Sequence, residues 1–166
     1  MTPILTTADI QHRLTRLAWQ LWEANFGADG LHLIGIGRGG YRLAELLAPE
    51  LAAIAPRLRL TRTRLTLNKA APLAQPMHLD PPAASLAGET VVLLDDVLNS
   101  GRTLAFALAE ILRRDPQRVQ TLLLVDRQHP AFPVAATFSG LTLATTATDH
   151  IRVELPADGA FGAWLV

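Results

Sequence analysis

The chain has 166 residues, no cysteine, and fifteen Lys and Arg side chains against fifteen Asp and Glu. The absence of cysteine excludes disulfide scaffolds, thiolate metal sites and a cysteine nucleophile, and zero formal charge argues against a dedicated nucleic-acid binder. A hydrophobic fraction of 49% argues against disorder, and the length predicts one domain over residues 1–166.

The chain carries no signal for a membrane or a secretory pathway. Its first residues lack a basic stretch followed by an apolar core. The longest uncharged segment, 129–148, contains two prolines and a glycine, which argues against a membrane span. We therefore expect a cytoplasmic protein.

The first half of the sequence alternates helical and strand patterns. Apolar residues at helical spacing (Ile10, Leu14, Leu17 and Leu21) follow Thr6 and Thr7, either of which can cap the helix. In chain order, the pattern predicts a helix over Thr6–Asn25, a buried strand over Leu31–Ile36, a helix from about Tyr41 that Pro49 kinks or splits, and a half-exposed strand over Leu58–Leu67.

The second half continues the alternation after a segment with four prolines. The pattern predicts a mobile loop over 68–84, a central parallel strand over Glu89–Asp96, a helix over Thr103–Arg114, a buried strand over Val119–Asp126, and short strands near Ala136–Leu143 and Ile151–Leu155. Strand–helix–strand alternation indicates an α/β fold with a mostly parallel central sheet and helices on both faces.

Two adjacent acids end the central strand. Asp95 and Asp96 lie where open α/β sheets bind ligands, and two neighbouring carboxylates need a cation or a hydroxyl-rich ligand beside them. Small and polar residues, a glycine and a helix N-terminus follow over 97–103, and they offer backbone N–H groups to an anion. This combination suits a ribose 5-phosphate better than a simple capped turn.

A glycine-rich turn follows the first buried strand. Residues Gly35–Gly40 match the spacing of the dinucleotide fingerprint, G-x-G-x-x-G. That motif also needs an acid about 20 residues further on, and residues 52–68 contain none, so we discount a nicotinamide dinucleotide. The turn can hold a pyrophosphate with help from Arg38, or it can be a turn without a ligand.

A third polar cluster follows the next strand. Val125, Asp126, Arg127 and His129 lie at the same predicted edge of the sheet, where Arg127 and His129 could border a base. The alternative is a polar turn held by an Asp–Arg pair.

These motifs resemble a known family. The string VVLLDDVLNSGRTL resembles the 5-phosphoribosyl-1-pyrophosphate (PRPP) signature of type I phosphoribosyltransferases. The strings LTRLAWQLWEAN, IGIGRGGYRLAELLA, LTLNKAAPL and LLLVDRQHPAFPVAATFSGL are similar, in the same order, to segments of the pyrimidine-operon attenuation regulator/uracil phosphoribosyltransferase (PyrR) family. The resemblance implies a type I phosphoribosyltransferase fold with a small C-terminal hood, and transfer of ribose 5-phosphate from PRPP to a nucleobase, with uracil suspected, releasing pyrophosphate.

The resemblance also implies roles by position. Asp95 and Asp96 would be catalytic, holding the ribose hydroxyls directly or through Mg²⁺, and Lys69 would approach the pyrophosphate from a lid over 68–84. The pyrophosphate loop, where related enzymes often carry a non-proline cis peptide, would be Gly37, Arg38 and Gly39. The 5-phosphate loop would be Asn99, Ser100, Gly101, Arg102 and Thr103, and the base pocket Val125, Asp126, Arg127 and His129.

Three segments differ from the family pattern. The lid has Asn68-Lys69-Ala70-Ala71 where the family has tyrosine, arginine and two aspartates. The phosphate loop has Asn99 and Ser100 in place of tyrosine and threonine, and the pyrophosphate loop has Gly-Arg-Gly in place of lysine, threonine and arginine.

Two other functions stay open. One is a nucleotide-sensing regulator of pyrimidine genes that binds RNA through Arg57, Arg59, Arg62 and Arg64; the other is a non-catalytic nucleotide-binding relative. We also expect a homodimer or larger assembly, because Trp19 lies opposite the apolar face of the first helix. Finally, Gly35 and Asp95 should end neighbouring strands if their loops share one ligand.

Overall fold

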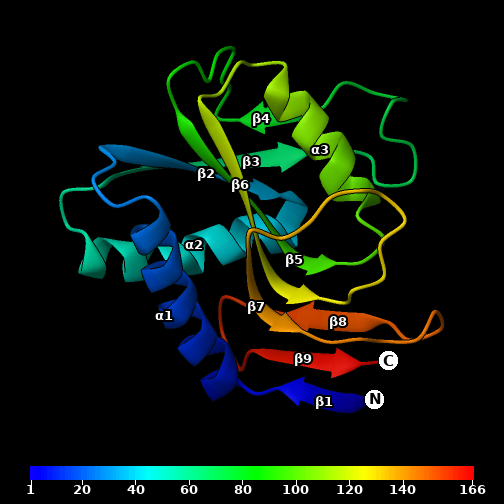
Figure 1. The fold of residues 1–166 in the computed structure, drawn as a ribbon. Helices are drawn as coiled ribbons and strands as arrows, with labels where there is room; N and C mark the ends of the chain where they lie inside the picture. Colours follow the sequence, from blue (N-terminus) through cyan, green and yellow to red (C-terminus); the bar gives the residue numbers. More distant parts are fainter.

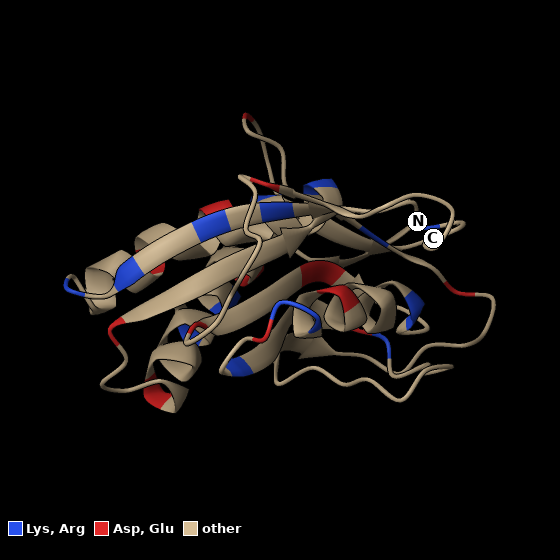
Figure 2. Ribbon diagram, turned by 90° about the horizontal axis from the view of Figure 1, so that it is seen from above, with Lys and Arg blue, Asp and Glu red and all other residues tan.

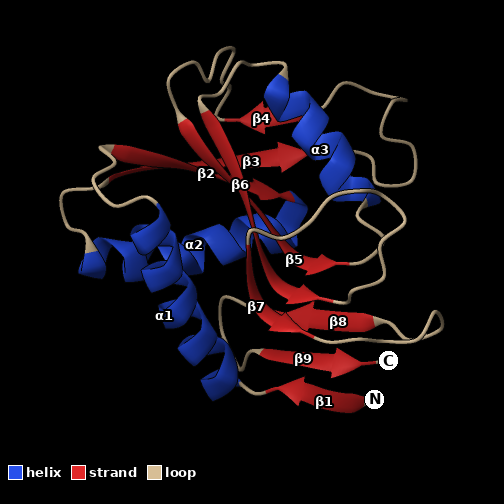
Figure 3. Ribbon diagram, in the orientation of Figure 1, coloured by secondary structure: helices blue, strands red, loops and turns tan.

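The computed structural model describes residues 1–166 and contains three helices and nine strands (Figures 1 and 3). The helices are α1 (Thr7–Ala24), α2 (Gly37–Ile54) and α3 (Arg102–Leu112). The strands are β1 (Thr2–Leu5), β2 (Gly30–Ile36), β3 (Arg59–Thr66), β4 (His78–Asp80), β5 (Thr90–Leu98), β6 (Arg118–Asp126), β7 (Phe138–Thr142), β8 (Ile151–Glu154) and β9 (Gly162–Leu165). None of the helices is both long enough and apolar enough to cross a membrane.

Six strands form the central sheet in the order β4-β3-β2-β5-β6-β7. Every neighbouring pair is parallel except β4, which runs antiparallel to β3 at one edge. Helices α1 and α2 pack on one face and α3 on the other (Figure 1). The predicted mostly parallel sheet with helices on both faces is confirmed.

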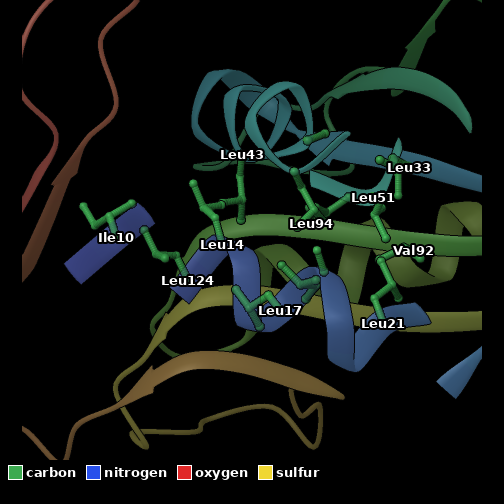
Figure 4. Packing of buried hydrophobic residues seen from close by; sticks show 14 of the residues in the cluster. Ile10, Leu14, Leu17, Leu21, Leu33, Leu43, Leu51, Val92, Leu94 and Leu124 are labelled. Atoms are coloured by element: carbon green, nitrogen blue, oxygen red, sulfur yellow. The ribbon is translucent and has the colours of Figure 1, made fainter. Parts of the chain in front are cut away.

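The inner strands are buried on both faces, which explains their nearly continuous apolar runs. Leu31 and Leu33 of β2 belong to a core of 21 buried residues shared with α1 and α2 (Figure 4). Ile34 and Ile36 point the other way, into a core of 12 buried residues shared with α3. Alternate side chains of one strand therefore hold helices on opposite sides of the sheet.

Helix α1 matches its prediction closely. Thr6 caps it: the Thr6 backbone N–H donates to Asp9 Oδ2 at 2.9 Å, and the Asp9 N–H donates to Thr6 Oγ1 at 3.2 Å. The Thr6 hydroxyl also donates to Asp9 Oδ2 at 2.6 Å, and this bond, together with the one from the Thr6 backbone N–H, holds the pKa of the Asp9 carboxyl below its usual value. Trp19 lies on the opposite face from the buried residues and is 53% exposed.

Helix α2 begins earlier than predicted and is not split. It starts at Gly37, which has a φ of +60° that favours glycine, and it runs without a break to Ile54. Pro49 lies inside the helix at an exposed position. Water can therefore hydrate the carbonyl that loses its partner there, which explains why this proline does not end the helix.

The segment 68–84 is not wholly a loop, as the sequence had suggested. Residues 78–80 form β4, and Leu79 lies opposite Leu65 of β3. Leu79 is buried between two exposed neighbours. Three residues are too few for a periodic signal, so this strand exists only because β3 offers an edge to pair with.

The hood is not purely C-terminal. A second sheet has the order β1-β9-β8, and β1 comes from the N-terminus. The two ends of the chain therefore lie side by side (Figure 1). β1 and β9 were not predicted from the sequence, because each has only four residues and their pairing joins segments about 160 residues apart.

Candidate active site

The candidate site lies where the chain changes direction across the sheet. From β2 the chain passes through α2 to β3 on one side, and from β5 it passes through α3 to β6 on the other. Strands β2 and β5 are parallel neighbours, with Gly35 opposite Leu94, so the predicted adjacency of the two loops is confirmed. In open α/β sheets, ligands bind in the crevice outside the carboxyl ends of strands at such a point.

Three glycines allow α2 to begin directly against this edge. A Cβ on Gly40 would overlap the Leu94 carbonyl oxygen of β5, and a Cβ on Gly39 would overlap the Asp96 carboxylate. A Cβ on Gly35 would overlap the backbone of Tyr41. The glycine-rich turn thus has a packing role, and this close packing brings the N-terminus of α2 beside Asp96.

The two acids at the end of β5 differ in burial. Asp95 is only 4% exposed, whereas Asp96 is half-buried. Asp95 Oδ1 accepts a hydrogen bond from the Asp96 N–H at 2.9 Å, and Asp96 Oδ1 accepts one from the Val97 N–H at 2.9 Å. Burial, with the nearby Asp96 charge adding to it and Lys69 opposing it, raises the pKa of Asp95 to about 8.

The acids line two different cavities. Asp95 lines a cavity of about 110 Å³ together with Lys69 and the loop 99–103. Asp96 lines a larger cavity of about 650 Å³ together with Arg38, Gly39 and the hood residues 153–157. The end of β5 therefore separates a phosphate-sized space beside α3 from a larger space beside α2.

The loop before α3 is shaped to bind an anion. Gly101 adopts a φ of +84° and, as the N-cap of the helix that starts at Arg102, has no side chain to cap it; the Arg102 N–H donates to Ser100 Oγ at 3.3 Å. The first N–H groups of such a helix lack intrahelical partners and point out of its end. The Arg102 side chain contacts the segment around Lys69, since its Nη1 donates to the carbonyls of Lys69 at 3.4 Å and Ala70 at 3.3 Å.

A third cavity, of about 320 Å³, lies on the other side of this loop. Asn99, Ser100 and Gly101 line it together with Asp126 and His129. Asp126 Oδ1 also accepts a hydrogen bond from the Gln128 N–H at 2.8 Å. Two of the four residues assigned to the base pocket are therefore at a cavity beside the phosphate loop.

The other two residues assigned to the base pocket do not line this cavity. Val125 is fully buried in the larger core. Arg127 is 6% exposed, and its guanidinium donates to Thr145 Oγ1 at 2.9 Å, the Thr146 carbonyl at 3.0 Å and Asn99 Oδ1 at 3.0 Å. Arg127 thus ties the phosphate loop to the segment that leads to the hood.

Comparison with known proteins identifies the family. Residues 3–158 match the family model of the phosphoribosyl transferase domain. The chain belongs to this family. It is 34% identical over 163 residues to the bifunctional protein PyrR of Geobacter sp. strain M21, covering 95% of this chain and 92% of that one. It is 37% identical over 161 residues to the bifunctional protein PyrR of Streptomyces coelicolor, covering 92% and 82%.

Solved structures support the same fold. A hypoxanthine-guanine phosphoribosyltransferase from Bacillus anthracis superposes with a TM-score of 0.75 at 16% identity, over 91% of this chain and 85% of that one. A hypoxanthine phosphoribosyltransferase from Trypanosoma cruzi gives 0.74 at 19% identity, over 90% and 83%. The type I phosphoribosyltransferase fold and the similarity to PyrR proteins, both expected from the sequence, are confirmed.

The phosphoribosyltransferase loops also depart from the family pattern in structure. The cis peptide bond of this chain is Asp80–Pro81, and the expected one in Gly37–Gly39 is not present. In the lid, Asn68 Oδ1 accepts hydrogen bonds from the N–H groups of Ala70 at 3.0 Å and Ala71 at 3.1 Å. The asparagine thus shapes a local turn, which holds Lys69 beside the phosphate loop.

Several residues of the candidate site were not assigned from the sequence. Arg64 of β3, Tyr41 of α2 and the hood residues 153–157 all line the cavity of Asp96. Arg64 looked like one of four similar arginines, and only its register opposite Gly35 places it at the site. The hood residues carry no motif, so their approach to Asp96 could not be read from local sequence.

Proposed function

We propose that the protein transfers ribose 5-phosphate from PRPP to a nucleobase nitrogen, with uracil as the first base to test, and releases pyrophosphate. The observation that carries this proposal is the placement of the two acids. PRPP has a phosphate on one side of its ribose and a diphosphate on the other. Asp95 and Asp96 stand between a small cavity beside the N-terminus of α3 and a large cavity that Arg38 lines.

Each part of PRPP would be bound by a different set of residues. Asp95 and Asp96 would accept hydrogen bonds from the ribose hydroxyls, and the N–H groups of residues 99–103 would bind the 5-phosphate. Arg38 and the start of α2 would neutralise the charge that develops on the departing pyrophosphate. No covalent nucleophile is required, because positioning and charge stabilisation supply the rate enhancement.

The acid pair also fits Mg²⁺. Neither Asp95 nor Asp96 has a Lys, Arg or His within ion-pair distance. The chain has no cluster of three or more His, Cys, Asp or Glu side chains that could hold a metal. Mg²⁺ usually binds through one or two carboxylates, waters and substrate phosphates, so Asp95 and Asp96 would hold it together with PRPP. The metal would supply positive charge near the leaving pyrophosphate.

Asn99 would meet the ligand as a hydrogen-bond donor. Its Oδ1 accepts from Arg127, which has only donors, so the amide nitrogen is left to face the cavities that Asn99 lines. A carbonyl oxygen of the base or a phosphate oxygen can accept that hydrogen bond. An amide cannot take a proton, so Asn99 would orient the ligand rather than act as a base.

Turnover tests the proposal. The protein would be incubated with PRPP, Mg²⁺ and uracil, with hypoxanthine in a parallel reaction, and the nucleoside monophosphate and pyrophosphate would be measured. We expect turnover with uracil and its loss in Asp96→Asn. If the wild-type protein binds no PRPP at millimolar concentration, the proposal is wrong. If it binds PRPP but turns over no base, the protein is a non-catalytic relative.

A second candidate function is an RNA-binding regulator. Arg59, Arg62 and Arg64 are exposed along β3, and Arg57 precedes them. Figure 2, in which Lys and Arg are blue, shows several blue segments along one strand of the sheet. None forms an ion pair with a carboxylate. Binding of RNA would weaken steeply with salt and would fall when Arg57, Arg59 and Arg62 become alanine. A gel-shift titration in two salt concentrations measures both effects.

We further propose a cytoplasmic homodimer of a single domain over residues 1–166. Trp19 on α1 is 53% exposed and Phe26, just after this helix, is 81% exposed, and exposed aromatic residues often anchor interfaces. Light scattering at micromolar concentration would give a dimer, and Trp19→Ser would shift it toward the monomer. A monomeric wild-type protein would contradict this assembly.

A further inference from the structure

Arg64 lies in the pyrophosphate side of the proposed site. It is a β3 residue opposite Gly35 of β2, next to the point where β2 leads into α2. Its side chain lines the cavity of about 650 Å³ together with Arg38 and Asp96. Two guanidinium groups from separate elements thus face the same space beside Asp96.

Tyr41 holds Arg64 in this position. Gly35 has no side chain, so the backbone of Tyr41 packs directly on β2. The Tyr41 ring then lies beneath Arg64, with the guanidinium carbon 4.6 Å from the ring centroid. An arginine stacked on an aromatic ring keeps its N–H groups free for an anion, and the stacking restricts its rotamers before the ligand arrives.

The other charges of this cavity are already paired. Glu45 accepts from Arg42 at 3.2 Å, and Glu154 lies 3.2 Å from Arg152. Neither Arg38 nor Arg64 has a carboxylate within ion-pair distance. After these pairs are formed, the cavity presents two arginines and Asp96, a set that suits a diphosphate bound with a divalent cation.

We propose that Arg64 is a pyrophosphate-binding residue of this protein, acting with Arg38 and held in place by Tyr41. The inference rests on the proposed phosphoribosyl transfer and assigns one more residue to its leaving group. A guanidinium fork binds phosphate oxygens through two parallel N–H···O bonds, and it stabilises negative charge that grows as the bond to the ribose breaks.

Binding of inorganic pyrophosphate tests the proposal without turnover. Calorimetry with pyrophosphate and Mg²⁺ would compare the wild-type chain, Arg64→Ala and Arg62→Ala. Arg62 is the matched control, because it is exposed two residues earlier on the same face of β3 but does not line the cavity. We expect Kd to rise about 10- to 100-fold in Arg64→Ala and less than about 2-fold in Arg62→Ala.

Three further variants separate binding from structure. Arg64→Lys keeps the charge without the fork, so its affinity should lie between those of the wild-type protein and Arg64→Ala. Tyr41→Leu should weaken pyrophosphate binding, whereas Tyr41→Phe, which keeps the ring, should bind almost as the wild-type protein does. The Arg64 variants should bind ribose 5-phosphate with unchanged affinity and melt at similar temperatures, since the Arg64 side chain is exposed and forms no ion pair with a carboxylate.

The outcomes distinguish this inference from the proposed function. If the wild-type protein binds PRPP and pyrophosphate but Arg64→Ala binds pyrophosphate equally well, the role of Arg64 is wrong and phosphoribosyl transfer stands. Equal losses in Arg64→Ala and Arg62→Ala would also overturn it, because they would indicate a general charge effect. If the wild-type protein binds neither compound, both the proposed function and the role of Arg64 fail.

Discussion

At the amino-terminal edge of the central sheet, the ring of His32 lies between Glu89 and Thr63. His32 is 6% exposed, and its two ring nitrogens lie 2.6 Å from Glu89 Oε2 and 2.6 Å from Thr63 Oγ1. At the carboxyl edge, Asp95 is equally buried at 4% exposed, but its carboxylate accepts only a backbone N–H and has no cation within ion-pair distance.

Both edges are formed by opposite ends of the neighbouring strands β2 and β5. The difference between the partners of His32 and those of Asp95 therefore indicates a difference in role. Buried charges are normally paired within the protein or bound to a metal, so a buried carboxylate without a cation calls for an explanation. At the amino-terminal edge the protein supplies the partners, which indicates a structural role. At the carboxyl edge the partner is left to a ligand, and the raised pKa of Asp95 records the cost of leaving it without one.

Replacing Asp96 should give the largest effect on ligand binding. Asp96→Asn keeps the shape of the side chain but removes the charge, so PRPP with Mg²⁺ should bind about 5- to 150-fold more weakly, the scale of a lost charge-assisted hydrogen bond. The free energy of unfolding should stay the same or rise, because a like charge beside Asp95 is removed. Calorimetry and thermal melting measure the two effects. If Asp96→Asn were less stable and bound PRPP as well as the wild-type protein does, Asp96 would have a structural role and the carboxyl edge would not bind the ligand.

Replacing His32 should lower the stability of the protein and leave PRPP binding unchanged. His32→Ala leaves Thr63 without its partner and opens space in a buried region, so the free energy of unfolding should fall by about 2 kcal/mol. PRPP binding should not change, because the ring lies at the far end of β2. Urea unfolding and PRPP calorimetry check the pair of expectations. Weaker PRPP binding in a folded His32→Ala protein would contradict a purely structural role.

The stability difference between the wild-type protein and Asp95→Asn should depend on pH. The pKa of Asp95 rises from 3.8 to about 8 on folding, so the folded state holds an extra proton between these values. The stability contributed by Asp95 therefore falls as pH increases across this window and is constant above it. The stability of Asp95→Asn relative to the wild-type protein should therefore increase by about 3 kcal/mol from pH 5 to 7.5. Melting curves without Mg²⁺ test this, and parallel pH profiles would contradict it.

Replacing Lys69 should give the smallest effect. Its positive charge lowers the pKa of Asp95 and it lines the cavity of the phosphate loop. Lys69→Ala should reduce kcat/KM several-fold, and Lys69→Arg should restore most of it, because an exposed charge acts through screened electrostatics. Steady-state kinetics with PRPP measure both variants. Unchanged kinetics in Lys69→Ala would show that the lid lysine has no role in turnover.

The local sequence predicted correctly the elements whose apolar residues follow a clear helical or strand pattern. The prediction of α1 came from the helical spacing of its apolar residues Ile10, Leu14, Leu17 and Leu21. Its start was predicted within one residue from Thr6 and Asp9. The apolar runs around Leu33 and Leu93 gave the two central strands. Pro49 misled the prediction of α2, because its effect depends on exposure, which a sequence does not state.

Pairing partners and register were out of reach of such patterns. β1 and β9 are short and pair only because the ends of the chain meet, and β4 depends on a free edge of β3. Arg127 looked like a residue of the base pocket, but three hydrogen bonds bury it between two loops. Arg64 became a candidate only when the register placed it opposite Gly35 and over Tyr41.

The sequence by itself determined that an acid pair ends a buried strand, that small residues precede the next helix, and that glycines follow the neighbouring strand. Those features are local, because they depend on strand length, backbone freedom and the order of residues along the chain. The tertiary structure decided which cavity each acid faces, which arginine joins them and which polar groups are satisfied. These depend on strand order and register, since parallel pairing brings together side chains that lie 30 to 60 residues apart in the chain.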